Sequence, residues 1–253
     1  MIRMQADELI ERIYAEGKVT GLSGAAHDLH SSIDRHEGEF LTSIIASDPT
    51  IRKTLEVGAA YGLSTLYICS SLQDREGGHH TIIDPDQTTA WCGAAINGLL
   101  EAGLDFFELV ESPSEYALPR MAEASPANFD LVFIDGWHTF DHTLVDCFYA
   151  LRLLRVGGVL AIDDANLRSV RRVIAFLANY PCLKKIGTVR QGPEKWYVRA
   201  LAVIMSLPPG RRFWARLLNP ALFSQVFERK ADMVAFKKVA ADERTWAWHD
   251  DRF

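Results

Sequence analysis

The most constraining feature of the chain is an alternation of short apolar segments with longer amphipathic ones between residues 51 and 189. The apolar segments, such as 131–134 and 159–162, are continuous runs in which every position is apolar. Continuous apolar strands separated by helices indicate a parallel sheet that helices cover on both faces. We therefore predict an α/β fold: a doubly wound, mostly parallel sheet of seven strands.

The expected elements follow from this alternation. Strands are expected at 54–57, 81–83, 106–110, 131–134, 159–162, 183–189 and 233–239, and core helices at 62–72, 88–102, 113–122, 142–154 and 166–179. Residues 1–50 are predicted to be an N-terminal helical segment, 51–189 the binding core, and 231–253 the last strand and the C-terminal tail, all within one domain.

Residues 190–230 interrupt the pattern before the last strand. Their aromatic and basic residues, and the improbability of so long an irregular loop, predict a helical insertion with helices at 197–205 and 211–227. Three roles remain open for it: a packing or dimerisation appendage, a lid over the substrate, and a contact with a membrane surface or an anionic partner.

Composition narrows the function classes. The 253 residues carry 27 Lys and Arg against 33 Asp and Glu, a net charge of −6 that argues against a general nucleic-acid binder. The four cysteines include no C-x-x-C pair, which is typical of reduced thiols. No signal peptide is recognised at the start, and no apolar run approaches the ~20 residues that span a bilayer. We expect a cytoplasmic enzyme.

A glycine turn follows the first core strand. In Glu56-x-Gly58-x-x-x-Gly62, the glycines permit a sharp turn and close packing of the next helix. Glu56 suits a cationic ammonium group, whereas Ser64 and Thr65, at the positive helix end, suit a carboxylate. An ammonium and a carboxylate together describe the methionine half of S-adenosylmethionine. A purely structural strand–helix turn is the alternative.

The same turn disfavours a pyrophosphate ligand. Ala60 stands where a dinucleotide-binding turn has its second glycine, and the Lys-Ser/Thr of a P-loop is absent. The predicted cofactor contacts in this segment are Glu56, Gly58, Ala59, Tyr61, Gly62 and Ser64.

Two further segments can complete a nucleoside site. Asp84 ends the second core strand, where a carboxylate can accept hydrogen bonds from both ribose hydroxyls, and Asp86 competes for this role. Ser114 and Glu115, after the third strand, can meet the adenine amino group. The structural alternatives are an Asp-Pro turn and an ordinary helix cap.

Three aspartates close two later strands. Asp135 follows one apolar run, and Asp163 and Asp164 follow the next. Because the carboxyl ends of parallel strands meet at one edge of the sheet, these carboxylates are expected to repel one another unless a cation lies between them. Ligands that are all oxygen suit Mg²⁺, Ca²⁺ or Mn²⁺. Helix capping is the alternative role for these residues.

His138 lies close after Asp135 and is the predicted general base, since an imidazole titrates near neutral pH. Trp137 can stack on adenine or face a sulfonium. Asp141, His142 and Asn166 are alternates for these roles, while His27, His30 and His36 are interpreted as ordinary.

With these motifs the chain resembles the class I S-adenosylmethionine-dependent methyltransferases. More narrowly, it is similar to cation-dependent O-methyltransferases of the catechol and caffeoyl-CoA types and to bacterial natural-product sugar O-methyltransferases. The similarity covers roughly residues 35–180, and it is carried by Glu56-x-Gly58-x-x-x-Gly62-x-Ser64-Thr65 and by the run from Phe129 through Asp135-Gly136-Trp137-His138.

The resemblance implies roles residue by residue. The family's metal aspartates fall on Asp135, Asp163 and Asp164, the adenine-stacking tryptophan of the catechol type on Trp137, and its catalytic lysine on His138. Some sugar-modifying relatives use a histidine at that position.

Two positions depart from the catechol type. Asp164 replaces an asparagine ligand, which makes the empty site more negative, and the ribose-binding glutamate matches Ile82, which leaves Asp84 as a substitute. Residues 190–230 match no pattern of the family, and acceptor specificity is expected there.

The sequence thus predicts a cation-dependent, most simply Mg²⁺-dependent, O-methyltransferase that acts on a small-molecule hydroxyl of a sugar or phenolic compound. The alternatives are a metal-independent O- or N-methyltransferase and a non-catalytic partner subunit with the same fold. No nucleic-acid partner is expected, and a homodimer is possible.

Overall fold

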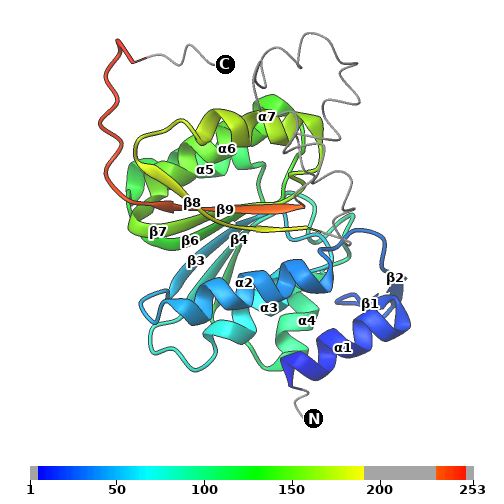
Figure 1. Ribbon diagram of the computed structural model, residues 1–253. Coiled ribbons are helices and arrows are strands. Elements are labelled where there is room, and N and C mark those ends of the chain that lie inside the picture. Colours follow the sequence, from blue (N-terminus) through cyan, green and yellow to red (C-terminus); the bar gives the residue numbers. More distant parts are fainter. Residues whose placement is uncertain (1–4, 191–231, 249–253) are drawn as a thin grey trace, which may run out of the picture.

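A computed structural model describes residues 5–190 and 232–248 of the chain, and a seven-stranded sheet runs through them (Figure 1). The strand order is β5-β4-β3-β6-β7-β9-β8; β3 to β7 are parallel, and β9 is antiparallel to both of its neighbours. The bounds are β3 (Lys53–Val57), β4 (His79–Ile83), β5 (Phe107–Val110), β6 (Phe129–Ile134), β7 (Leu154–Ile162), β8 (Leu183–Val189) and β9 (Met233–Lys238). The predicted fold class is confirmed.

Helices cover both faces of the sheet (Figure 1). One face carries α2 (Arg35–Ser47), α3 (Leu63–Leu72) and α4 (Ala94–Ala102), with α1 (Ala6–Glu16) packed outside them, and the other carries α5 (Ser114–Ala124), α6 (Phe140–Leu153) and α7 (Arg168–Leu177). None of the helices within the described ranges is long and apolar enough to cross a membrane.

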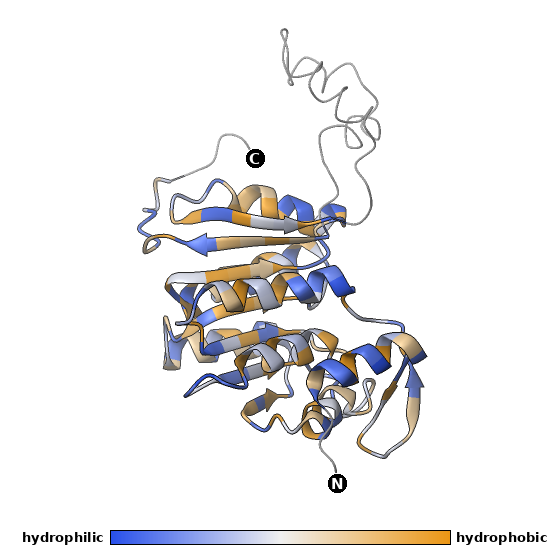
Figure 2. Cartoon of the chain, turned by 60° about the horizontal axis from the view of Figure 1, so that its bottom comes forward, coloured by the Kyte–Doolittle hydropathy of each residue, from blue (hydrophilic) through white to orange (hydrophobic). Residues whose placement is uncertain are grey.

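The apolar runs serve two cores at once. On β6, Leu131 and Phe133 pack into the core on the α3 side, while Val132 and Ile134 pack into the core on the α6 side. Figure 2 shows hydrophobic residues along the strands and hydrophilic residues on the outer surfaces of the helices. This double burial explains why the strands lack an alternating polar face.

The N-terminal segment differs from the prediction. Residues 1–50 were expected to contain helices only, but a hairpin of β1 (Lys18–Thr20) and β2 (Ala26–Asp28) lies between α1 and α2. These strands are too short to show a periodic pattern. The hairpin tip packs against Gly93, so the expected helix 88–102 begins only at Ala94, after Cys92 and Gly93 in left-handed conformation. The predicted helices 197–205 and 211–227 lie outside the described residues.

The connections place a crevice at one edge of the sheet. From β3 the chain proceeds to β4 and β5 on one side, and it then returns to β6 on the other side of β3. In sheets of this type ligands bind at such a reversal, outside the carboxyl ends of the strands. The glycine turn after β3 and Asp135 after β6 both lie at that point.

At Gly58 the glycine turn after β3 packs directly against the backbone of Asp135. Gly58 has a left-handed φ of 82°, and an added Cβ would lie 2.2 Å from the carbonyl oxygen of Asp135. Asp135 also donates its backbone N–H to Val57 O at 2.8 Å. Glycine is therefore required by both conformation and space.

We predict that Gly58→Ala lowers the free energy of unfolding by about 3 kcal/mol or more, because strain and a backbone clash add. Gly77→Ala is the matched control: Gly77 has a φ of 73° but no atom within 4 Å of the added Cβ, and about 1 kcal/mol is expected there. Chemical denaturation measures both. Equal losses would contradict the clash with Asp135.

Candidate active site

A cavity of about 570 Å³ lies at the carboxyl ends of β3, β4 and β6 and the start of α5. Its size falls within the range of small-molecule and cofactor pockets. The predicted residues that line it are Gly58, Ala59, Ser64, Asp84, Ser114, Glu115, Asp135, Trp137 and His138. The structure therefore brings most of the predicted cofactor contacts to one cavity.

Three predicted cofactor residues, Glu56, Tyr61 and Gly62, do not line this cavity. Glu56 is fully buried, and its Oε2 accepts a hydrogen bond from Thr65 Oγ1 at 2.6 Å, with His80 Nε2 at 3.3 Å. Thr65, considered for the carboxylate of the cofactor, is thus used inside the fold. The other oxygen of Glu56 has no hydrogen-bond partner among the described residues.

Tyr61 and Gly62 support the cavity from behind. The Tyr61 hydroxyl lies 2.7 Å from His30 Nε2, and its ring packs edge-on against Trp91, which lines the cavity. Gly62 has a φ of 85°, and an added Cβ would lie 2.4 Å from the Cα of Ala95. Trp91 is a lining residue that sequence reasoning missed.

Asp84 holds the glycine turn in place. Its Oδ2 accepts hydrogen bonds from the backbone N–H groups of Ala59 and Ala60, both at 3.0 Å, and its Oδ1 accepts one from Asp86 N at 2.9 Å. These bonds also explain the left-handed φ of 46° at Ala60. Asp86 is exposed and lines the cavity, so its carboxylate is more open to a ribose.

A second, acidic pocket of about 230 Å³ adjoins the cavity. The two share Asp135 and His138, together with Ser31 and Ser32. The pocket is lined by six carboxylates: Asp34, Glu37, Asp135, Asp163, Asp164 and Asp232. Within the described part of the chain, no lysine or arginine lines it.

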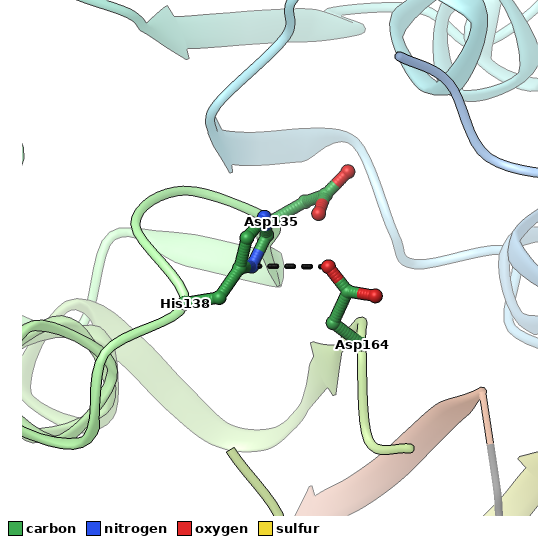
Figure 3. A group of neighbouring side chains, drawn as sticks. All are labelled: Asp135, His138 and Asp164. Atoms are coloured by element: carbon green, nitrogen blue, oxygen red, sulfur yellow. Dashed lines mark ion pairs between the residues drawn. The ribbon is translucent and has the colours of Figure 1, made fainter. Parts of the chain in front are cut away.

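Asp135, His138 and Asp164 converge in this pocket (Figure 3). Their nearest ligand atoms lie within 4.8 Å of one another, and His138 Nδ1 is 3.1 Å from Asp164 Oδ2. Asp164 has a left-handed φ of 51°, a strained conformation typical of functional sites. The structure therefore brings the predicted base together with two of the three predicted metal aspartates.

Asp163 stands apart from this trio but lines the same pocket. The residue is 8% exposed, and its buried Oδ1 has no hydrogen-bond partner among the described residues. A buried carboxylate oxygen without a donor is costly unless a cation or a proton satisfies it.

Burial and the closeness of other carboxylates raise the pKa values of Asp135 and Asp163. Burial, and then the nearby charge of Asp164, raises the pKa of Asp135 well above its usual range. Burial, and then Asp135 itself, does the same to the pKa of Asp163. A divalent cation relieves both effects, because it replaces repulsion by coordination. The carboxylate oxygens of this pocket are ligands that suit Mg²⁺, Ca²⁺ or Mn²⁺.

Three of the acidic residues were missed from the sequence: Asp34, Glu37 and Asp232. Asp34 and Glu37 form a capping box at the start of α2, and the spacing Asp34-x-x-Glu37 is a recognisable signal for that helix start. That signal says nothing about the pocket, however. Asp232 reaches the site only because β9 inserts beside β7.

Comparisons with known proteins point to the same kind of fold and site. Residues 55–165 match the family model described as a methyltransferase domain. The resemblance to class I methyltransferases is thereby confirmed.

A curated sequence relative and solved structures are consistent with this family match. Catechol O-methyltransferase B of Danio rerio is 31% identical over 157 residues, which are 58% of this chain and 55% of the relative. The chain thus spans about half the length of that curated relative. Two crystal structures share the fold.

Cofactor-bound Rv0187 from MTB has a TM-score of 0.58 and 19% identity, over 92% of this chain and 89% of the other. The O-methyltransferase from Bacillus cereus in complex with SAH has a TM-score of 0.55 and 21% identity, over 72% and 81%. At these identities both structures support the fold alone.

The matched segment also contains a buried carboxylate that the sequence reasoning passed over. Asp146 on α6 is 1% exposed, and neither of its oxygens has a hydrogen-bond partner of good geometry among the described residues. Burial raises the pKa of Asp146 to about 6, although the Ser114 side chain beside it opposes the shift.

We predict that Asp146→Asn stabilises the protein increasingly as pH rises. Because the pKa of Asp146 in the folded state lies above its unfolded value, stability is lost as pH rises from about 4 to about 6. The variant lacks this loss. Its free energy of unfolding should match that of the wild type near pH 4 and exceed it by about 1–3 kcal/mol at pH 8. Urea denaturation across pH measures the difference, and a difference independent of pH would contradict the prediction.

Proposed function

We propose that the chain is an S-adenosylmethionine-dependent O-methyltransferase that uses a divalent cation, most simply Mg²⁺, and acts on a hydroxyl of a small molecule such as a sugar or a phenolic compound. The observation that carries the proposal is the junction of the two pockets. The cofactor-sized cavity and the acidic pocket share Asp135 and His138 in their linings, so a methyl donor and a hydroxyl acceptor can meet there.

We assign the turn at Gly58 and Ala59, together with Ser64, to the methionine half of the cofactor. Asp86 is assigned to its ribose, and Ser114 and Glu115 to its adenine. All of these residues line the cavity. S-adenosylmethionine supplies an activated methyl group when bound. A related fold, the Bacillus cereus enzyme, was crystallised with the demethylated product SAH.

Asp135 and Asp164 are the residues that would hold the cation, with the unpartnered oxygen of Asp163 beside them. A bound cation lowers the pKa of a coordinated hydroxyl and fixes the direction of its oxygen. The surrounding carboxylates of Asp34, Glu37 and Asp232 increase the negative potential of the pocket. They favour a cation and disfavour an anionic acceptor.

His138 is positioned to remove the proton of the acceptor. Asp164 Oδ2 lies 3.1 Å from Nδ1, an arrangement in which Nδ1 carries the hydrogen and Nε2 keeps its lone pair. The ring lines both pockets. The carboxylate thus fixes the tautomer that a general base needs.

The same pair favours a second candidate, a metal-independent O-methyltransferase. In that case Asp164 and His138 act as a carboxylate–imidazole pair without a cation, and the hydroxyl loses its proton to Nε2 alone. The two candidates differ in what a chelator does to turnover.

Divalent cation should stabilise the folded protein. We predict that about 10 mM Mg²⁺ at pH 8 raises the free energy of unfolding of the cofactor-free wild type by about 1–3 kcal/mol, because it offsets repulsion between the aspartates. Asp163→Asn should remove most of this gain, and excess EDTA should abolish methyl transfer from S-adenosylmethionine to hydroxyl acceptors.

The matched control is Asp105→Asn, which removes the same charge from an exposed position. Asp105 lies just before β5, at the edge of the sheet opposite the carboxyl ends of the strands. The variant should keep the full response to Mg²⁺. Full turnover in EDTA, together with no effect of Mg²⁺ on unfolding, would favour the metal-independent candidate.

His138→Gln should separate chemistry from binding. We predict that kcat falls by about 10²–10⁴-fold, since proton removal loses its base, while the dissociation constant for SAH changes by less than about threefold. His36→Gln, at a histidine whose side chain is 71% exposed, is the control with no expected effect. Turnover assays and calorimetry measure the two quantities. An unchanged kcat would remove His138 from the mechanism.

A further inference from the structure

The loop that carries His138 is hydrogen-bonded to the start of α7. The Ser169 hydroxyl donates to the backbone carbonyl oxygen of His138 at 2.6 Å. Ser169 is the second residue of α7, and it lies 31 positions after His138 in the chain. The bond therefore joins the helix that follows β7 to the loop that follows β6.

The neighbouring carbonyl groups of this loop bond to a different helix. The hydroxyl of Thr143, on α6, lies 2.8 Å from the carbonyl oxygen of Thr139 and 3.4 Å from that of Trp137. Trp137 and Thr139 are thus held from the α6 side, and His138 is held from the α7 side. A change at Ser169 should therefore affect His138 more than Trp137.

His138 is also held through its ring. Nδ1 of His138 lies 3.1 Å from Asp164 Oδ2 (Figure 3). Asp164 and Ser169 belong to the same connection after β7, in which Leu167 donates its backbone N–H to the carbonyl oxygen of Asp164 at 2.8 Å. One short segment therefore contacts His138 at two points, the backbone carbonyl oxygen and the imidazole.

The second point of contact matters because the ring pair is partly exposed. The side chain of His138 is 41% exposed, and that of Asp164 is 33% exposed. A pair at such exposure is weak by itself, because water competes for both partners and each side chain loses rotational freedom. A fixed backbone lowers this loss, since fewer conformations remain for the side chain to give up.

We propose that Ser169 is a positioning residue: through the carbonyl oxygen of His138 it keeps the imidazole against Asp164, so that Nδ1 carries the hydrogen and Nε2 is left to accept a proton. This inference rests on the proposed function, in which His138 is the general base. Ser169 lines neither pocket, so it acts only through His138. Misplacing a reacting group by about 1 Å can slow a reaction by up to ~10²-fold.

Turnover of the full chain with S-adenosylmethionine and Mg²⁺ tests the proposal. The acceptor probes are catechol and methyl α-glucopyranoside, one phenolic and one sugar compound. In Ser169→Ala, kcat should fall by about fivefold to fiftyfold, whereas the acceptor KM and the dissociation constant for SAH should change by less than about threefold. Ser169→Thr keeps the hydroxyl and should retain at least about a third of the wild-type kcat.

A second readout needs no acceptor. Long-range ¹H–¹⁵N NMR spectra of the histidine-labelled, metal-free protein at pH 8 show which ring nitrogen carries the hydrogen, and His138→Gln identifies the signals of His138. The wild type and Ser169→Thr should have the hydrogen on Nδ1. Ser169→Ala should show a mixture of the two tautomers, because its ring is released from Asp164.

Ser43→Ala is the matched control. Ser43 also donates its hydroxyl to a backbone carbonyl oxygen, that of Phe40 at 2.7 Å, but within α2. The control should leave kcat and the tautomer of His138 unchanged. Ser169→Ala combined with His138→Gln should be no slower than His138→Gln alone, because Ser169 acts through that ring. Thermal unfolding checks that each variant is folded.

The outcomes are distinct. An unchanged kcat or an unchanged tautomer in Ser169→Ala overturns the proposal, and so does a wild type without the hydrogen on Nδ1. A loss in Ser169→Thr as large as that in Ser169→Ala overturns it too, since the hydroxyl would then have no role. A wild type that holds the tautomer but methylates neither probe counts against the proposed function, and the inference falls with it.

Discussion

The contact between Gly58 and the backbone of Asp135 sets the geometry on which the whole site depends. It joins the turn after β3 to the end of β6 with no room for a side chain between them. The turn after β3 lines the larger cavity, and Asp135 at the end of β6 lines both the cavity and the acidic pocket. The distance between a bound methyl donor and the acidic pocket is therefore fixed by backbone packing, which is stiffer than any side-chain arrangement.

The electrostatics of the site divide the acids into two groups. The Asp84 carboxylate accepts hydrogen bonds from backbone N–H groups of the glycine turn and thereby stabilises that turn. Asp135 and Asp163 have raised pKa values because burial, and then repulsion by neighbouring carboxylates, disfavours their charged forms. Groups of the second kind lower the stability of the empty protein, which is the usual consequence of preorganising a site for a charged ligand.

The fold could be predicted almost completely from the sequence, because continuous apolar runs and glycine turns are local signals. The hairpin at Lys18–Asp28 was missed since its strands are too short for periodicity. In the site, residues at strand ends were found, as topology alone brings them together. Glu37 and Trp91 were not, because each lies on another segment and joins the site only through tertiary packing. Glu56 has the residue type that suits an ammonium group, but the structure uses it in the core.

The central claim is that the acidic pocket holds a divalent cation beside the cofactor cavity. Crystals of the protein grown with SAH and Mn²⁺ test it directly, because manganese gives an anomalous signal that locates the ion without assumptions about its ligands. The account predicts one strong peak bound by carboxylate oxygens of Asp135 and Asp164, with Asp163 in contact with it or with its water. A map with SAH in the cavity but no peak in the acidic pocket would contradict the claim.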